Sequence, residues 1–220
     1  GEGLKISILT FFKESLRHTI AEVIPWYWGV FDWLGVTYPR DVHRVINRLM
    51  IIAGVGVLIK IYFAIKQRTK DSYIFLFLLF ATLTYFLGII YYNYLFTIAH
   101  SFPFGIQGRY YFPTIVAHMG IFLMGSVTLV PERYKIVRNL IAKILGFGMI
   151  ALSVISFWVI AKTYYDLSSI NIFITQVSQY KPDLFKGWFM QFILYITFLL
   201  NVLFLIYYLF LKDSKQVLKK

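Results

Sequence analysis

Cysteine is absent from the 220 residues, so the chain has no disulfide bonds and no cysteine-ligated metal. Charge is scarce as well, because Asp, Glu, Lys and Arg together make up only 15% of the residues, against about 25% in soluble domains. Acidic residues are the rarest of these, with 10 against 22 basic ones. A chain with so little charge lacks the polar surface of a soluble domain, which argues against soluble enzymes and soluble binding modules.

Hydrophobic residues are what the chain has instead, at 59% of the sequence, with 20% aromatic. Five apolar runs are each about 20 residues or longer, which is the length a helix needs to cross ~30 Å of hydrocarbon. Lipid offers the backbone no hydrogen-bonding partners, so each run must satisfy its own backbone as a helix. We therefore predict an all-α integral membrane protein with five transmembrane helices, at 46–65, 73–98, 110–130, 140–161 and 188–211.

The connections between these helices differ in basic charge. Three basic residues lie in 66–71, four in 131–143 and four between 212 and 220, whereas Arg109 stands alone between the second and third helices. Connections rich in Lys and Arg stay in the cytoplasm, so we expect the N-terminus outside and the C-terminus inside. The net charge of +12 then reflects topology and attraction to anionic membrane lipid, and no nucleic-acid partner is expected.

Three regions follow from this arrangement. Residues 1–41 form an outer region with an amphipathic helix and an aromatic loop, residues 42–212 form the transmembrane helical domain, and residues 213–220 form a basic cytoplasmic tail. The outer N-terminus is not preceded by an export signal in the sequence. We therefore expect further spanning segments upstream of Gly1.

The outer region has two parts with different patterns. In "LKISILTFFKESLRHTIAEVIPW" the apolar residues recur at spacings of three and four, which predicts an amphipathic helix lying on the membrane rather than crossing it. Packing against a partner domain is the alternative. The next stretch has six aromatic residues between Trp26 and Tyr38, together with Gly29 and Gly35. It predicts a folded re-entrant loop whose aromatic faces suit contacts with sugars or isoprenoids.

Three arginines follow at helical spacing, namely Arg40, Arg44 and Arg48, with His43 on the adjoining face. They lie on the side of the membrane where few positive charges are expected. One interpretation is pairing with Asp41 and with lipid phosphates. The other is an anion-binding site, because charges near the hydrocarbon are costly and usually face a cavity in the protein.

Arg109 is the only charged residue between Asp71 and Glu132, and it lies in the segment "SFPFGIQGRYYFP". The predicted third helix begins next to it, so the free N–H groups of that helix would favour an anion there. Gly105 and Gly108 would let the backbone approach a ligand, and the planar guanidinium matches phosphate oxygens.

We predict an outward-facing phosphate site at this segment, completed by the neutral hydrogen-bonding groups of Gln107, Tyr110 and His100. The alternative is that Arg109 anchors the chain at the interface. A further alternative is that Arg109 forms a structural ion pair with Asp32 or Asp41.

The motif "FGIQGRYYFP", preceded by "WYWGVFDWLGVTYP", resembles the C-terminal half of a family of predicted bacterial membrane proteins of unknown function. Members of that family carry a "VQGRYFLP"-type motif and a "FWGxFGWL"-type stretch, and Asp32 stands here where they usually have glycine. The family is similar to membrane glycosyltransferases of the GT-C class. The resemblance implies sugar transfer from a polyprenyl-phosphate carrier to a glycan acceptor on the outer face of the plasma membrane, in cell-envelope glycan synthesis, with Arg109 meeting the carrier phosphate.

The resemblance also implies that the catalytic part is elsewhere, since GT-C enzymes keep their catalytic aspartate in the first outward loop. That loop would lie upstream of Gly1, so we assign no catalytic residue, and any divalent metal would be held upstream too. No other cofactor is expected. Asp32 is a weak candidate for a base and a better one for orienting Arg109 or Arg44.

Two other classes of function remain open. A lipid-linked glycan transporter would need polar residues inside several helices, and the second, fourth and fifth helices offer few. A non-catalytic membrane assembly subunit would need no polar site at all. The outer set of Arg44, Arg48 and Arg109 is therefore the feature that discriminates among the three.

Overall fold

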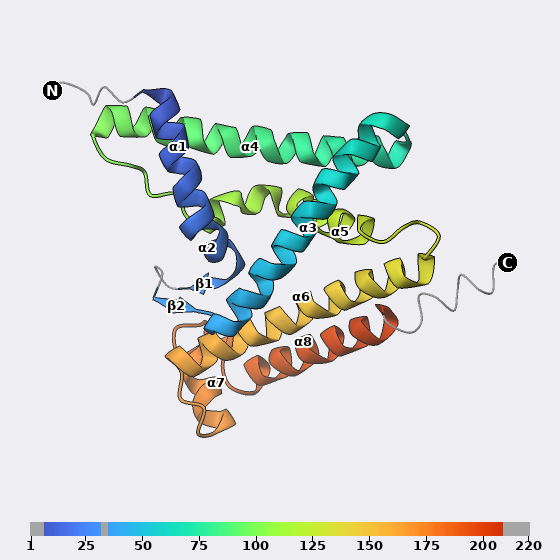
Figure 1. Cartoon of the computed structure of the whole chain (residues 1–220). Coiled ribbons are helices and arrows are strands. Elements are labelled where there is room, and N and C mark those ends of the chain that lie inside the picture. The colour runs from blue at the N-terminus through green and yellow to red at the C-terminus, as the bar shows by residue number, and fades with distance from the viewer. Residues whose placement is uncertain (1–6, 32–34, 209–220) are drawn as a thin grey trace. The chain divides into compact units, whose positions relative to one another are not determined.

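The computed structural model describes residues 7–31 and 35–208, which are almost entirely helical (Figure 1). Within these ranges five segments are long and apolar enough to cross a membrane. The predicted all-α integral membrane fold with five spanning segments is therefore confirmed. The segments are α3 (Arg40–Gln67), α4 (Lys70–His100), Gly108–Thr128, α6 (Lys135–Tyr164) and α8 (Trp188–Ile206).

Helix boundaries differ from the predicted ones, most clearly at α3. This helix begins at Arg40, six residues before the predicted start at 46. Pro39 precedes it in an extended conformation, with φ −53° and ψ 145°; proline lacks an N–H and is tolerated at a helix start. Hydropathy locates the hydrocarbon-crossing part of a helix but not the polar turns that extend it, and α6 likewise begins at Lys135, before the predicted 140.

A two-residue connection joins α3 to α4. Arg68 ends α3 in the left-handed conformation, with φ 49°. Thr69 then caps α4, because its Oγ1 accepts a hydrogen bond from the Ser72 amide at 3.2 Å. So short a connection makes the two helices antiparallel neighbours, and Figure 1 shows them diverging from this turn.

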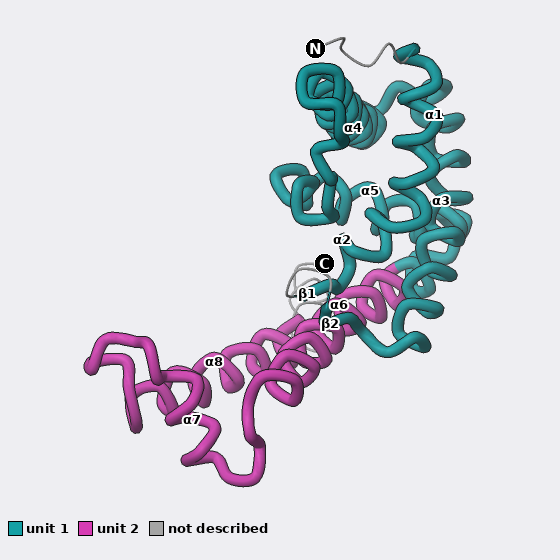
Figure 2. The backbone as a smooth tube through the Cα atoms, turned by 90° about the vertical axis from the view of Figure 1, so that its left-hand side faces the viewer, with its two compact units in different colours: residues 1–138 teal, residues 139–220 magenta. Residues whose placement is uncertain are grey.

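The chain divides into two compact units, residues 1–138 and 139–220, coloured separately in Figure 2. In the first unit, α3 packs closely on α5 (Ile115–Thr128). A Cβ atom on Gly56 would collide with the carbonyl group of Gly125, and a Cβ on Gly125 would lie 2.5 Å from the Ala53 oxygen and 2.7 Å from a Val57 methyl. The two backbones therefore touch, as small residues allow in membrane helices.

The N-terminal region belongs to this first unit. Helix α1 (Ile8–His18) crosses α4 at a steep angle (Figure 1), with the Phe11 and Tyr94 rings 5.4 Å apart. Ser15 is buried on the protein side, whereas Ile8 and Leu9 remain 55% and 75% exposed. Helix α1 thus keeps an apolar face that the described protein does not cover. Its position in the membrane interface remains a prediction.

The aromatic stretch continues from α1 through a π-helical turn, η1 (Thr19–Val23), into a short helix, α2 (Ile24–Gly29). Strands β1 (Val30–Phe31) and β2 (Val36–Thr37) then pair antiparallel, with Val30 opposite Thr37. The Tyr38 ring lies directly against Gly29 and leaves no room for a side chain there. The described part of the stretch is therefore folded, as a short helix and two paired strands, and its re-entrant position in the membrane stays a prediction; Asp32 lies outside the described residues.

The second unit contains most of α6, followed by α7 (Ile170–Ser178), the 3₁₀ turn η3 (Asp183–Phe185) and α8. Helices α6 and α8 lie side by side, and the Tyr208 hydroxyl donates to the Ala142 carbonyl at 3.3 Å (Figure 1). The connection 165–187 is folded, because it contains α7 and η3.

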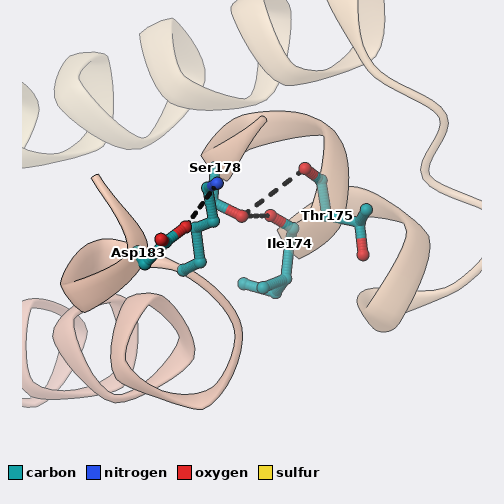
Figure 3. Close-up of polar contacts among 5 residues, drawn as sticks. Ile174, Thr175, Ser178 and Asp183 are labelled. Carbon is teal, nitrogen blue, oxygen red and sulfur yellow. Dashed lines mark hydrogen bonds and ion pairs between the residues drawn. The ribbon is translucent and has the colours of Figure 1, made fainter. Parts of the chain in front are cut away.

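Local polar contacts hold this folded connection together (Figure 3). The buried Ser178 hydroxyl donates to the Ile174 carbonyl at 2.6 Å. The Lys186 ammonium hydrogen-bonds Asp183 at 2.8 Å and lowers the pKa of that carboxyl group. These contacts are local in sequence, so they stabilise the connection without fixing a ligand site.

The predicted orientation can be tested by single-cysteine labelling, because the natural chain has no cysteine. We expect Ser101→Cys and Tyr180→Cys to react with an impermeant thiol reagent on intact cells, and Gln67→Cys and Glu132→Cys to react only after permeabilisation. All four positions are exposed in the structure, Tyr180 at 93%. The reverse pattern would invert the topology.

Candidate functional site

The segment that precedes Arg109 is fixed to the end of α4. Ser101 ends this helix in the left-handed conformation, with φ 63°. Three residues later the Phe104 amide donates to the buried Asn93 side chain at 2.8 Å, and Ile106 is buried in a cluster with Val23. The "FGIQG" turn is therefore anchored by one side-chain hydrogen bond and one apolar contact.

Gly108 has a different role from the one its sequence context indicated. A Cβ at this position would collide with the backbone of Trp26 and Tyr27 in α2. The glycine therefore permits close approach of the chain to itself, and the predicted close approach to a ligand is wrong for this residue. Gly105, which has φ +74°, has open space around its Cα.

The predicted α-helical N-terminus beside Arg109 is also wrong. Residues Gly108–Thr114 form a 3₁₀ helix, η2, in which the Tyr110 amide donates to the Gln107 carbonyl at 3.1 Å. Helix α5 begins only at Ile115. Pro113 lies inside η2 and has no amide to continue an α-helical ladder, which accounts for the tighter turn. The regular α-helix therefore begins six residues beyond Arg109, and only the short 3₁₀ helix begins beside it.

The Arg109 side chain is exposed, and its guanidinium carbon lies 5.7 Å from the centre of the Tyr110 ring. The backbone of Tyr110 is held in turn, because the Tyr85 hydroxyl donates to its carbonyl at 2.9 Å. A guanidinium beside an aromatic ring keeps its charge and gains a favourable contact. Arg109 is thus presented from a rigid backbone at the end of a spanning segment.

The predicted residues of α3 lie in its first turns. The Arg44 guanidinium pairs with Asp41 at 2.7 Å, and this pair is solvent-exposed, which agrees with the structural interpretation of Arg44. The His43 ring packs on Tyr38 with centroids 5.8 Å apart, and Arg48 is exposed. These residues share the start of α3, whereas Gln107, Gly108, Arg109 and Tyr110 share η2 and its cap.

His100 lies at the C-terminal end of α4. Its ring stacks on Phe96 with centroids 4.1 Å apart, and its Nδ1 lies 3.0 Å from the Phe96 carbonyl oxygen. The imidazole is therefore held by its own helix. Its predicted part in completing a phosphate site remains a prediction, as do the roles of Gln107 and Arg48.

A chain of hydrogen bonds that the sequence did not suggest links α2 to α5. The Tyr27 hydroxyl lies 3.1 Å from His118 Nδ1, and His118 Nε2 lies 3.1 Å from Thr114 Oγ1. Thr114 donates its proton to the Tyr111 carbonyl, so it accepts from Nε2–H and leaves Nδ1 to accept from Tyr27. Burial raises the pKa of Tyr27 to about 12, so its phenol is neutral and able to donate.

These hydrogen bonds help to position the η2 backbone that contains Arg109. Tyr27 also packs on Phe112 of η2, with ring centroids 5.6 Å apart. The one available sequence signal was His118 itself, a titratable residue inside an apolar spanning run. Its partner Tyr27 is 91 residues away. No local pattern connects the two.

Metal ligation was also considered. In residues 7–31 and 35–208 no three His, Asp or Glu side chains come together as a set of metal ligands. The groups at Arg109 can therefore supply a positive charge, hydrogen bonds from a planar guanidinium and contact with an aromatic ring.

Comparison of the chain with protein-family models, with curated proteins and with solved structures found no match. The family resemblance therefore rests on the "FGIQGRYYFP" and "WYWGVFDWLGVTYP" segments themselves. In the structure these two segments are in contact, since Gly108 abuts the backbone of Trp26 and Tyr27.

The anchoring of the turn before Arg109 is testable at Asn93. We expect Asn93→Ala to destabilise the fold by about 1–3 kcal/mol, because the partly buried Phe104 amide loses its acceptor. Backbone amides of 102–107 should exchange with deuterium faster than in the wild type. Asn201→Ala in α8 is the matched control, because this exposed amide contacts only its own helix. Unchanged protection of 102–107 in Asn93→Ala would contradict the anchoring.

Proposed function

We propose that this chain is the lipid-binding part of a GT-C-type membrane glycosyltransferase. It binds a polyprenyl-phosphate-linked sugar at the outer face of the plasma membrane, with Arg109 contacting the carrier phosphate. The sugar passes to a glycan acceptor, and no catalytic residue is assigned within these 220 residues. In this assignment Arg109, the isolated charge between the second and third spans, binds a phosphate group.

The observation that carries the proposal is the placement of Arg109. It is the only charged residue in 60 residues of apolar chain, it is exposed at the end of a spanning segment, and the backbone on both sides of it is anchored. A planar guanidinium binds two phosphate oxygens at once, which a lysine cannot do. A headgroup phosphate at the membrane surface is a ligand of matching charge and depth.

Aromatic residues around this position support a lipid-linked sugar as the ligand. Tyr110, Phe112 and Trp26 come from η2 and α2, and each is partly or largely exposed. Aromatic faces pack against sugar rings and isoprenoid chains without needing a further charge. Arg48, exposed near the start of α3, offers a second cation for the anionic lipid surface.

The proposal is tested by binding to the chain in nanodiscs. We expect saturable binding of polyprenyl phosphate, competition by the polyprenyl-phosphate sugar, and no competition by the polyprenol that lacks the phosphate. Binding should weaken as salt rises, because charge contributes to it. Equal binding of polyprenol and polyprenyl phosphate would show that the site does not recognise the phosphate, and this result would contradict the proposed function.

A further inference from the structure

An apolar cavity of about 360 Å³ lies within the first unit. Its walls come from α3, α4, α5 and the N-terminal segment η1–α2, and include Val57, Leu79, Phe86 and Phe122. This volume falls within the range of roughly 300–1,000 Å³ that is usual for small-ligand sites. The cavity does not include Arg109, so what it binds is independent of the proposed phosphate contact.

Two hydroxyl groups in the cavity wall have no hydrogen bond. Thr82 Oγ1 on α4 and the Tyr111 hydroxyl on η2 are both buried, and neither has a partner among the described residues. Tyr111 as a whole is only 6% exposed. Thr19 is a polar neighbour of Tyr111 and donates its own proton to the Ser15 carbonyl at 2.8 Å, but its oxygen does not meet the Tyr111 hydroxyl in hydrogen-bonding geometry. A buried hydroxyl without a partner is costly, so these two groups call for a ligand oxygen.

The lining extends along two spanning helices. Along α4 it runs from Leu79 to Phe86, and along α3 from Met50 to Val57. Each stretch covers seven residue steps, or roughly 10 Å at the helical rise. A cavity of this length and polarity fits an extended hydrocarbon chain better than a compact polar molecule.

The cavity also opens toward the bilayer. Gly54 on α3 and Leu83 on α4 both line it and are both exposed, and each lies well inside a membrane-spanning helix. The opening between these helices therefore faces lipid, and a lipid chain can enter from the side.

We propose that this cavity holds one acyl chain of a membrane ester lipid, whose ester carbonyl accepts a hydrogen bond from the Tyr111 hydroxyl. Tyr111 is the fourth residue of its spanning segment Gly108–Thr128, which places it near the headgroup boundary where ester groups lie. A prenyl chain carries no carbonyl and would leave the hydroxyl unpaired. Water would pair the hydroxyl but leave the long apolar wall without contacts.

The test uses methyl 9,10-dibromostearate, whose bromine atoms quench tryptophan, titrated into the delipidated protein in detergent. Trp28 lines the cavity and reports occupancy. Gly54→Leu fills the opening, since a Cβ there meets no atom within 4 Å. Gly88→Leu is the matched control, because Gly88 has the same open surroundings in α4 but does not line the cavity.

We expect saturable quenching in the wild type and in Gly88→Leu, and at least tenfold weaker binding in Gly54→Leu. Tyr111→Phe should weaken binding of the ester roughly three- to tenfold, as expected for one hydrogen bond. It should leave binding of the matching dibrominated alkane unchanged. Arg109→Ala should change neither ester binding nor alkane binding. The acyl-chain site and the phosphate site are therefore tested independently.

Equal quenching in Gly54→Leu and Gly88→Leu, with both variants melting like the wild type, would place the probe on the outer surface and overturn the proposal. Equal ester affinity in Tyr111→Phe and the wild type would overturn the hydrogen bond. Displacement of the ester by stoichiometric polyprenol would assign the cavity to a prenyl chain instead.

Discussion

Gly56→Val should lower the melting temperature strongly. A Cβ on Gly56 collides with the Gly125 carbonyl group, which is backbone and cannot move aside as a flexible side chain would. Helices α3 and α5 would have to separate along their whole contact. Overpacking of a core costs about 1–3 kcal/mol, and we expect this backbone collision to cost at least the upper value. That is a large share of a total stability of roughly 5–15 kcal/mol.

The measurement is thermal unfolding in detergent, with Gly54→Val as the control. Gly54 lies two residues earlier on the same helix, and a Cβ there meets no atom within 4 Å. The control introduces the same side chain and the same change in helix propensity. A melting temperature for Gly56→Val equal to that of Gly54→Val would show that α3 and α5 are not in backbone contact.

Arg109→Lys should weaken binding of polyprenyl phosphate about ten- to hundredfold, although it keeps the charge. Loss of one charge-assisted hydrogen bond to phosphate costs about 1.5–3 kcal/mol, and lysine offers a point charge in place of a planar pair of donors. Arg109→Ala should lose more. Folding should survive both changes, because the side chain is exposed.

Arg48→Lys is the matched control, an exposed arginine at the start of α3 where the same exchange should change binding little. The structural interpretation of Arg109 makes a different prediction. If Arg109 is the ion-pair partner of Asp32, Asp32→Asn should lower the melting temperature as much as Arg109→Ala does. Unchanged lipid binding in Arg109→Lys, together with a lowered melting temperature, would refute the phosphate contact.

The membrane fold was predictable from the sequence because it depends on one averaged property, the hydropathy of runs of about 20 residues. All five spans were found that way. Their ends were not, because Arg40 and Lys135 begin helices whose first turns are polar. Hydropathy indicates which segments lie in hydrocarbon, whereas the residue at which a helix starts depends on local features such as Pro39.

The contacts between spans were not predictable. Gly56 meets Gly125, and Tyr27 meets His118, only because of how each helix is rotated and which neighbour it faces. An apolar segment shows little periodicity, so its sequence does not fix that rotation. The candidate site shows the same limit: Arg109 stood out by its isolation, but the packing of Gly108 on α2 depends on a residue 81 positions away in sequence, Tyr27.

Helix α8 contains no buried residue, although it is among the most hydrophobic segments of the chain. Its side chains are partly or largely exposed throughout, so few of them depend on close packing against a protein neighbour. Among homologous chains we expect α8 to exchange Leu, Ile, Phe and Val freely over evolutionary time. Gly56, Gly108 and Gly125, each pressed against a neighbouring backbone, should resist replacement over the same divergence.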